Sequence, residues 1–366
     1  MNLRWLGLGL VLSGCAHVTV AVEPLKLEEV VATSQQLAGV AISAASGRVF
    51  INFPRWVDQP TDSVAEVWAD GKVLPFPNAE WNAWDGTPQT AGEHFVCVQA
   101  VFVDDQDQLW ILDPASPLFG GVVPGGAKLV QVDLASGKVK RVYRFDADAA
   151  PTKSYLNDAR IDLPRGKAYL SDSGLGALVV VDLSTGAARR RLEASPAVQA
   201  EPGLALTIGG QPWVGADGTS PPIPSDGIAL DAEGKWLYFQ ALTGRTLYRV
   251  PAASLADGAV TEAALAAQVE KVADTFAADG LLADAKGNLF ATDLEHDSVR
   301  IRRPDGKLST VITDPRLSWP DSLAIDPAGR LYITASQVQR MPGFNGGVDK
   351  RERPFHLYRT VTAAVP

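Results

Sequence analysis

Three aspartates occupy equivalent positions in a pattern that the sequence repeats. Asp226, Asp279 and Asp321 each stand five residues before a second aspartate, which opens a tight turn that ends in glycine. An apolar segment of strand length lies between the two aspartates and another follows the turn, so each copy predicts two strands joined by a turn. The same spacing, counted back from the turn aspartates of two earlier copies, reaches Asn157 and Gln99. We therefore expect these five side chains at matching ends of neighbouring strands.

Carboxylates that converge on one site need compensation for their charge, from a cation, a protonated neighbour or several N–H donors. Because oxygen ligands without His or Cys suit a hard ion, Ca²⁺ or another divalent cation is one candidate. An organic ammonium ion is the other. A third interpretation is structural: each aspartate would cap the start of its strand by accepting backbone N–H bonds from the neighbouring repeat.

Aromatic residues in the long loops of the chain would surround such an ammonium ion. Carboxylates beneath aromatic faces bind an amine through charge and through cation–π contacts. The aromatic side chains that we expect to form these walls are Trp56, Trp81, Trp84, Phe119, Trp213, Trp319 and Phe344.

The repeat also predicts the fold. Six consecutive units can be laid out, each with short strands rich in β-branched and aromatic residues and with turns at Gly and Asp. Such a series indicates an all-β protein, a six-bladed β-propeller. The sixth unit lacks an outer strand, and Leu25–Ala32 is a strand without a partner at the other end of the chain. Pairing the two would close the ring and remove an exposed edge, so we expect residues 25–366 to form one propeller domain. An open pair of sandwiched sheets fits the regular repeat less well.

The topology of a propeller sorts the loops onto two faces. The turn after each first strand is short, and these turns share one face, which we call the turn face. The opposite face, the loop face, would carry the long connections 53–62, 78–95, 114–127, 195–225 and 337–354. Long loops gathered on one face usually mark a functional site.

The N-terminus reads as a processing signal. Arg4 precedes a short apolar run, Leu6–Leu12, and Leu12-Ser13-Gly14-Cys15 is typical of a bacterial lipobox. We expect residues 1–14 to be a lipoprotein signal peptide, Cys15 to be lipidated, and residues 15–24 to link the anchor to the domain. The alternative is an ordinary secretory signal with a chance cysteine. Ala16 stands where an aspartate would retain the lipoprotein at the inner membrane of many Gram-negative bacteria, which favours the outer membrane and an extracytoplasmic domain.

Composition excludes several classes of function. The chain has 366 residues, 46% of them hydrophobic and 20% charged, which excludes a disordered protein. A net charge of −9 without a basic cluster argues against nucleic acid as a partner. With Cys15 lipidated, Cys97 has no partner for an intramolecular disulfide, and its apolar neighbours favour a buried, inert thiol. A closed propeller needs no second copy for stability, so we expect a monomer.

The sequence resembles the major royal jelly protein/Yellow family, in a bacterial branch, over nearly all of the mature chain. The stretches that carry the resemblance are Val49–Trp56, Leu109–Asp113, Lys128–Leu134, Leu156–Asp162, Ala168–Ser173 and Ser225–Leu230, with Pro75–Pro77 before Trp81 and Asn82. The resemblance implies a six-bladed propeller. It also implies binding of a small amine or aromatic ligand, since the family includes binders of biogenic amines and proteins linked to pigment chemistry, and it supplies no shared catalytic motif.

A more distant similarity links the chain to gluconolactonase and regucalcin-type propellers. It implies a divalent cation held by Glu, Asn and Asp, with Asn157, Asp226 and Asp279 at comparable positions. The protein would then be a metal-dependent lactonase, with Asp158 or Asp321 as the base. The chain departs from this pattern at the start of the first blade, where Ala38 and Gly39 stand in place of the Glu. The incomplete ligand set makes binding the first hypothesis and hydrolysis the second.

Overall fold

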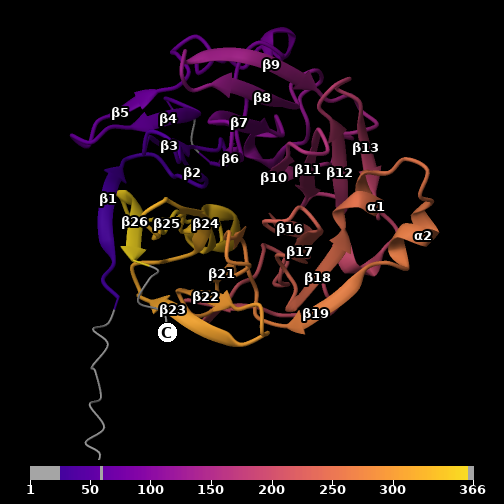
Figure 1. The fold of residues 1–366 in the computed structure, drawn as a ribbon. Coiled ribbons are helices and arrows are strands. Elements are labelled where there is room, and N and C mark those ends of the chain that lie inside the picture. The colour runs from indigo at the N-terminus through magenta and orange to yellow at the C-terminus, as the bar shows by residue number, and fades with distance from the viewer. Residues whose placement is uncertain (1–24, 58–60, 362–366) are drawn as a thin grey trace, which may run out of the picture.

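Six four-stranded sheets surround a central channel in the computed structural model, which describes residues 25–57 and 61–361 (Figure 1). The prediction of a six-bladed propeller is confirmed. The predicted signal peptide, Cys15 and linker lie outside the described residues. In the part of the chain that the structure describes, no helix is long and apolar enough to span a membrane.

The first three blades follow one another along the chain, with antiparallel neighbours throughout. Blade 1 consists of β2 (Val40–Ile42), β3 (Val49–Asn52), β4 (Val64–Val67) and β5 (Val73–Pro75). Blade 2 consists of β6 (Ala100–Val103), β7 (Gln108–Asp113), β8 (Lys128–Asp133) and β9 (Lys138–Arg144). Blade 3 consists of β10 (Leu156–Asp162), β11 (Lys167–Asp172), β12 (Ala177–Asp182) and β13 (Ala188–Arg191).

The other three blades complete the ring. Blade 4 consists of β16 (Ser225–Leu230), β17 (Trp236–Ala241), β18 (Thr246–Pro251) and β19 (Glu270–Asp274). Blade 5 consists of β20 (Leu281–Ala283), β21 (Leu289–Asp293), β22 (Ser298–Arg302) and β23 (Leu308–Thr313). Blade 6 consists of β24 (Pro320–Ile325), β25 (Arg330–Ala335), β26 (Phe355–Val361) and, from the other end of the chain, β1 (Glu28–Thr33).

Ring closure occurs as the sequence predicts. β1 pairs antiparallel with β26, from Glu28 opposite Arg359 to Thr33 opposite Phe355. Because this pairing joins the first strand of the chain to the last, it leaves blade 6 with a full set of four strands. The N-terminal strand is therefore part of the fold rather than an extension of it.

Three features interrupt the regular repeat and were not predicted. Two short helices, α1 (Ala252–Ala256) and α2 (Glu262–Ala266), lie between β18 and β19 and stand out from the ring (Figure 1). A small hairpin, β14 (Thr207–Ile208) and β15 (Gln211–Pro212), lies in the long connection before blade 4. Single 3-10 turns occur at Pro88–Thr90, Pro117–Phe119, Pro196–Val198, Val338–Arg340 and Pro342–Phe344.

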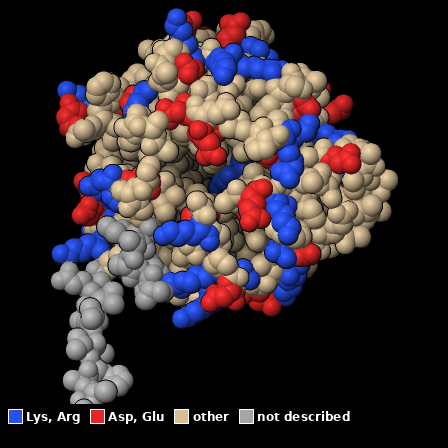
Figure 2. Space-filling view, viewed as in Figure 1, with Lys and Arg blue, Asp and Glu red and all other residues tan. Residues whose placement is uncertain are grey.

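The core lies between the blades. Trp110 and Leu129 of blade 2, for example, share one buried cluster with Leu170 and Val179 of blade 3. Because both faces of each sheet are covered in this way, a strand in the middle of a blade, such as β12, is buried at almost every position. The face shown in Figure 2 is hollowed at the centre of the ring, and acidic and basic side chains are interspersed around the hollow.

Buried aspartates at the ends of second strands hold the loop face in place. Asp113, at the end of β7, accepts the backbone N–H groups of Val96 (2.7 Å), Cys97 (2.9 Å) and Ala115 (2.8 Å). It also accepts a bond from Lys128 Nζ at 2.8 Å, and both side chains are fully buried. Burial raises the pKa of the Cys97 thiol to about 12, so this cysteine stays protonated and inert.

The Lys128–Asp113 ion pair provides a test of this anchoring. The Lys128→Met variant leaves Asp113 buried and unpaired, and we expect it to lose about 3–5 kcal/mol of unfolding free energy in urea titrations. Lys72→Met removes the exposed pair with Asp70 and should leave the unfolding free energy nearly unchanged. Equal effects of the two substitutions would contradict the role given to Asp113.

Candidate functional site

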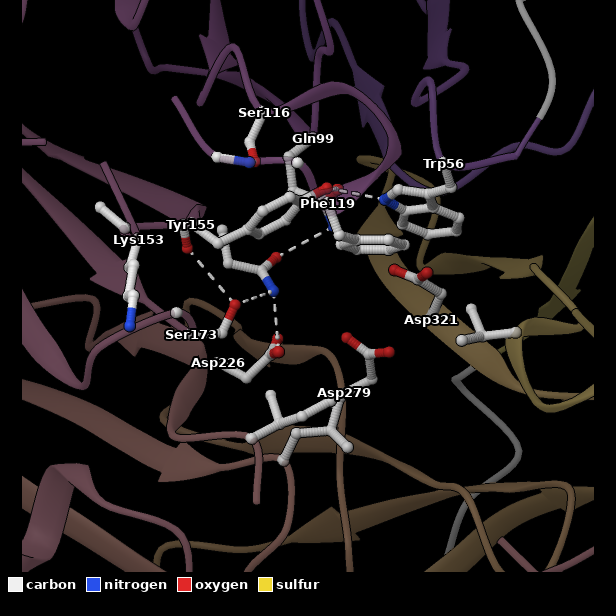
Figure 3. A pocket seen from close by; sticks show the side chains of 18 of the residues that line it. Trp56, Gln99, Ser116, Phe119, Lys153, Tyr155, Ser173, Asp226, Asp279 and Asp321 are labelled. Atoms are coloured by element: carbon white, nitrogen blue, oxygen red, sulfur yellow. Dashed lines mark hydrogen bonds between the residues drawn. The ribbon is translucent and has the colours of Figure 1, made fainter. Parts of the chain in front are cut away.

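A cavity of about 590 Å³ opens at the loop-face end of the central channel. This volume is typical of sites for small organic molecules. Its floor includes Gln99, Asn157, Asp226, Asp279 and Asp321, one residue from each of blades 2 to 6. The ring position that the sequence spacing predicts is therefore a real structural position (Figure 3).

Irregularities in the first strands direct these side chains to the channel. The pairing of β10 with β11 shifts register between Leu156 and Ala159, and Asn157 lies within the shift. The equivalent shifts in blades 4 and 6 include Asp226 and Asp321. A bulge of this kind redirects a side chain that would otherwise follow the alternation of the strand.

Glycines after two of the aspartates allow the blades to approach one another. A Cβ atom at Gly227 would lie 2.2 Å from the carbonyl oxygen of Asp279, and one at Gly280 would lie 2.2 Å from that of Asp321. Real Cβ atoms do not come so close to backbone. In each Asp-Gly pair, the aspartate thus places a carboxyl group at the channel, and the glycine leaves room for the backbone of the neighbouring blade.

The three carboxyl groups are buried and lie beside one another. Asp226, Asp279 and Asp321 are 2%, 8% and 4% exposed, and they face the same space (Figure 3). In the described part of the chain, no salt bridge involves any of them, and the only cationic residue that lines the cavity is Lys153, which is exposed at its rim. The described residues therefore provide no cation to balance a negative charge on this floor.

Hydrogen bonds link the floor residues in one direction. Nε1 of Trp56 donates to the Tyr155 hydroxyl (2.7 Å), which donates to Oε1 of Gln99 (2.8 Å). Nε2 of Gln99 then donates to Oδ1 of Asn157 (3.1 Å), and Nδ2 of Asn157 donates to Oδ2 of Asp226 (2.7 Å). Tyr155, Gln99 and Asn157 each accept one bond in this series and donate the next.

The chain of bonds ends on a pair of carboxyl groups. The side chains of Asp226 and Asp279 interact directly, which raises the pKa of Asp226 and lowers that of Asp279. Two buried carboxyl groups that interact in this way do not both ionise, so one of them holds a proton. Asp279 also accepts a bond from Nε1 of Trp319 at 2.7 Å. Each of the two carboxyl groups thus accepts one bond from a neutral side chain. The charge of Asp321 raises the pKa of Asp226 in addition, so we assign the proton to Asp226 and the negative charge to Asp279.

The pKa values follow this assignment. Burial, and then the charges of Asp279 and Asp321, hold the pKa of Asp226 well above its usual range. Burial raises the pKa of Asp279 to about 6, while the bonds from Trp319 and Asp226 limit the rise. Burial and the charge of Asp279 also hold the pKa of Asp321 well above its usual range, despite the bond from Ser336 Oγ to Oδ2 (2.8 Å).

These bonds bear on the structural interpretation of the ring aspartates. In the described residues, the carboxyl groups of Asp226, Asp279 and Asp321 accept hydrogen bonds from side chains and none from backbone N–H groups. Backbone N–H groups at the start of the inner strands are instead capped by other aspartates, such as Asp172, which accepts from Tyr155 N at 2.7 Å. Strand capping thus does not explain the ring.

Aromatic side chains form two walls above the floor. On one side Phe119 lies between Trp56 and Tyr155, with ring centroids 6.1 and 5.4 Å away. On the other side Trp213 lies between Trp319 and Phe344, at 5.1 and 4.9 Å. Phe119 is 53% exposed and has a φ of 54°, so a large apolar ring stands at the mouth on a strained backbone.

Three of the residues singled out from the sequence lie elsewhere. Trp81 packs on Phe95 below the loops, and Nε1 of Trp84 donates to the carbonyl of Thr87 at 3.0 Å. Asp158 lines a separate cavity in the channel nearer the turn face, where it forms an ion pair with Arg160. Trp81, Trp84 and Asp158 therefore do not line the cavity on the loop face.

Tyr155 is the main residue of the site that the sequence did not single out. It is buried, it lies two residues before Asn157, and it joins Trp56 of the first long loop to Gln99. The repeat gives no signal for it, because its position depends on a loop from another blade. Ala38, at the ring position of blade 1, packs against Tyr155 and Trp56 in place of a polar group.

The floor residues, as they are arranged, do not form a complete set of oxygen ligands for a divalent cation. Asn157 presents its nitrogen, not its oxygen, to Asp226, and its oxygen accepts from Gln99. At blade 1 the ring position is Ala38, whose methyl group offers no ligand to an ion. In the described residues, no group of three His, Cys, Asp or Glu side chains is placed to hold a metal ion.

The shared proton gives a testable effect on stability. An unfolded aspartate has a pKa of about 3.9, so the folded protein binds the Asp226 proton more tightly, and stability falls as the pH rises from about 4 towards the native pKa. Asp226→Asn keeps one acceptor for Asn157 and one donor for Asp279. We expect it to raise the unfolding free energy at pH 7.5 by about 1–3 kcal/mol and to have little effect at pH 3.5.

The matched control is Asp231→Asn, at the turn aspartate five residues later, which should give no gain at pH 7.5. Chemical denaturation at the two pH values measures both effects. A loss of stability in Asp226→Asn at pH 7.5 would contradict the assignment of the proton.

Comparison with solved structures finds proteins of similar fold and low sequence identity. A gluconolactonase from Xanthomonas campestris is 14% identical with a TM-score of 0.57, over 95% of this chain and 93% of that one. A luciferin-regenerating enzyme is 12% identical with a TM-score of 0.57, over 93% and 96%. The calcium-binding protein regucalcin from Agrobacterium tumefaciens is 15% identical with a TM-score of 0.54, over 93% and 95%. At these identities the similarity shows the fold alone.

Sequence comparison gives a more specific result. None of the curated proteins matches the chain in sequence. The model of the family described as major royal jelly protein matches residues 96–365, which is well over half of the 366 residues. The match includes blades 2 to 5, strands β24 to β26 of blade 6 and all five polar floor residues. The chain belongs to the major royal jelly protein family.

Proposed function

We propose that the protein binds a small aromatic amine, as its ammonium ion, in the cavity on the loop face. The observation that carries the proposal is the set of three buried carboxyl groups, Asp226, Asp279 and Asp321, to which no lysine or arginine of the described chain is paired. A buried negative charge without a partner is costly. A cationic ligand removes this cost on binding.

The walls suit the rest of such a ligand. Trp319 donates its N–H to Asp279, so the edge of an indole ring lies next to the carboxylate that carries the charge. An ammonium ion held there gains a charge-assisted hydrogen bond and cation–π contact with the aromatic rings. The family relationship supports this choice, since the sequence resemblance implies ligands of the biogenic-amine type.

Metal-dependent lactone hydrolysis is the competing function. The fold similarity to gluconolactonase and regucalcin favours it, and Asn157, Asp226 and Asp279 would hold the ion if the Asn157 amide turned its oxygen inward. The ion would supply a Lewis acid for the lactone carbonyl. The bond of Asn157 to Gln99, and Ala38 in place of an acidic residue at the ring position of blade 1, make this arrangement less favourable than binding of an amine.

Calorimetric titration with 2-phenylethylamine and its uncharged analogue 2-phenylethanol tests the proposal. We expect the amine to bind at pH 7.5 about tenfold or more tightly than the alcohol. Because the cation requires an ionised Asp279, whose pKa is about 6, affinity should weaken below pH 6 by up to about tenfold per pH unit for each proton displaced.

Two variants test whether the carboxyl groups of the floor are responsible for binding of the amine. Asp279→Asn should weaken binding of the amine and leave that of the alcohol unchanged, whereas Asp284→Asn, at the turn aspartate five residues later, should alter neither. Equal binding of amine and alcohol would refute the proposal. Stoichiometric Ca²⁺ in protein purified without chelator, lost in Asp279→Asn, together with lactone hydrolysis, would favour the competing function.

We further propose that the domain is anchored by a lipid on Cys15, outside the cytoplasm. β1 runs from the turn face, where Glu28 pairs with Arg359, to the loop face, where Thr33 pairs with Phe355. Residue 25 therefore enters the propeller from the turn face. An anchor joined through residues 15–24 would place the membrane on that side and leave the cavity mouth facing away from it.

The anchor has a direct test in cells. Cys15→Ser should move the protein from the membrane fraction to the soluble fraction and abolish incorporation of labelled fatty acid. Asp70→Ser, a change on an exposed turn, should affect neither. Membrane association that persists in Cys15→Ser would exclude the lipid as the anchor.

A further inference from the structure

The indole of Trp213 carries a buried hydrogen-bond donor that nothing accepts. Trp213 is 3% exposed and lines the cavity, and its Nε1 has no hydrogen-bond partner among the described residues. The other two indoles that line the cavity are both satisfied, Trp56 by the Tyr155 hydroxyl and Trp319 by Asp279. An unsatisfied donor beside a binding cavity is a candidate for contact with the ligand.

Backbone hydrogen bonds and ring contacts fix the position of Trp213. Its backbone N–H donates to the Leu206 carbonyl at 2.9 Å, and its carbonyl accepts from Ser220 Oγ at 2.8 Å. The ring packs against Trp319 and Phe344. The other buried residues of the cluster offer no side-chain acceptor, since all of them are apolar. They are Leu206, Ile208, Leu242, Ala277 and Leu294.

The position of Trp213 relative to the carboxyl floor limits what can satisfy it. Trp319 bonds to Asp279 at its N–H and meets Trp213 edge-on, with ring centroids 5.1 Å apart. An aromatic amine whose ammonium lies at Asp279 and whose ring crosses Trp319 would bring the far end of that ring to Trp213. An oxygen at that end would accept the free N–H bond.

We propose that Trp213 determines specificity, by donating Nε1–H to an oxygen at the far end of the ligand's ring. The inference rests on the proposed function and narrows it, from aromatic amines in general to arylethylamines with a hydroxyl or ether oxygen on the ring. A site with a spare buried donor discriminates against analogues that lack the acceptor, because those analogues leave the donor unpaired. Trp213 thus recognises the oxygen, whereas the carboxyl floor recognises the charge.

Two ligands of equal size test the acceptor in the unaltered protein. 4-Methoxyphenylethylamine has the ether oxygen, and 4-ethylphenylethylamine has a methylene group in its place. We expect calorimetry on the full-length protein in detergent to show about tenfold tighter binding of the methoxy compound. Equal affinities would overturn the inference, while binding of both amines would leave the proposed function standing. If neither amine binds, the proposed function fails and the inference fails with it.

A variant then assigns the preference to Trp213. Trp213→Phe keeps an aromatic ring in the cluster and removes the donor, and it should bring the two affinities to within about twofold by weakening only the methoxy compound. Trp84→Phe removes an indole whose N–H bonds to Thr87 outside the cavity, and it should preserve the preference. A preference that survives in Trp213→Phe would overturn the inference.

The indole N–H resonance gives an independent reading if the variant folds poorly. In ¹⁵N-labelled protein the Nε1–H signal of Trp213 should move downfield when the methoxy compound binds, and move much less with the ethyl compound. Matching shifts for the two ligands would contradict a hydrogen bond from Trp213.

Discussion

The burial of three carboxyl groups where the blades converge is the constraint on which the site depends. Asp226, Asp279 and Asp321 start adjacent inner strands, and the close approach of those strands brings their side chains together. The protein lowers the cost of this arrangement with a proton shared between Asp226 and Asp279 and with donors from Asn157, Trp319 and Ser336. No cationic side chain of the described residues pairs with these carboxyl groups, and the remaining negative charge is available to a cationic ligand.

The arrangement has a cost in stability that the rest of the propeller offsets. Buried carboxyls with raised pKa values destabilise the folded state at neutral pH, as expected for a binding site in a protein that is otherwise well packed. The interfaces between blades, the closure of blade 6 by β1 and the buried ion pair of Asp113 with Lys128 supply the stability. The donors of the floor run in one direction from Trp56 to Asp226, so each side chain also fixes the orientation of the next.

The sequence repeat predicted the features that depend on local strand and turn patterns. Strand and turn periodicity gave six blades and ring closure, and the spacing to the turn aspartates located the floor residues. The walls were harder to predict, because aromatic residues in long loops carry no period. Trp56, Phe119, Trp213, Trp319 and Phe344 line the cavity, but Trp81 and Trp84 pack beneath the loops. Tyr155 was missed because its role depends on contacts with two other blades, and the free donor of Trp213 depends on the absence of an acceptor, which no sequence pattern records.

The central claim is that the cavity binds a cation through carboxyl groups that hold a proton when no ligand is present. Titration of 2-phenylethylamine at pH 6 in buffers of different ionisation enthalpy measures the protons released per amine bound. Asp279 is about half ionised at this pH, and Asp226 and Asp321 hold protons that a cation would displace. The account predicts a net release of about half a proton or more that is reduced in Asp279→Asn. Binding without release of protons, or release that is unchanged in the variant, would contradict it.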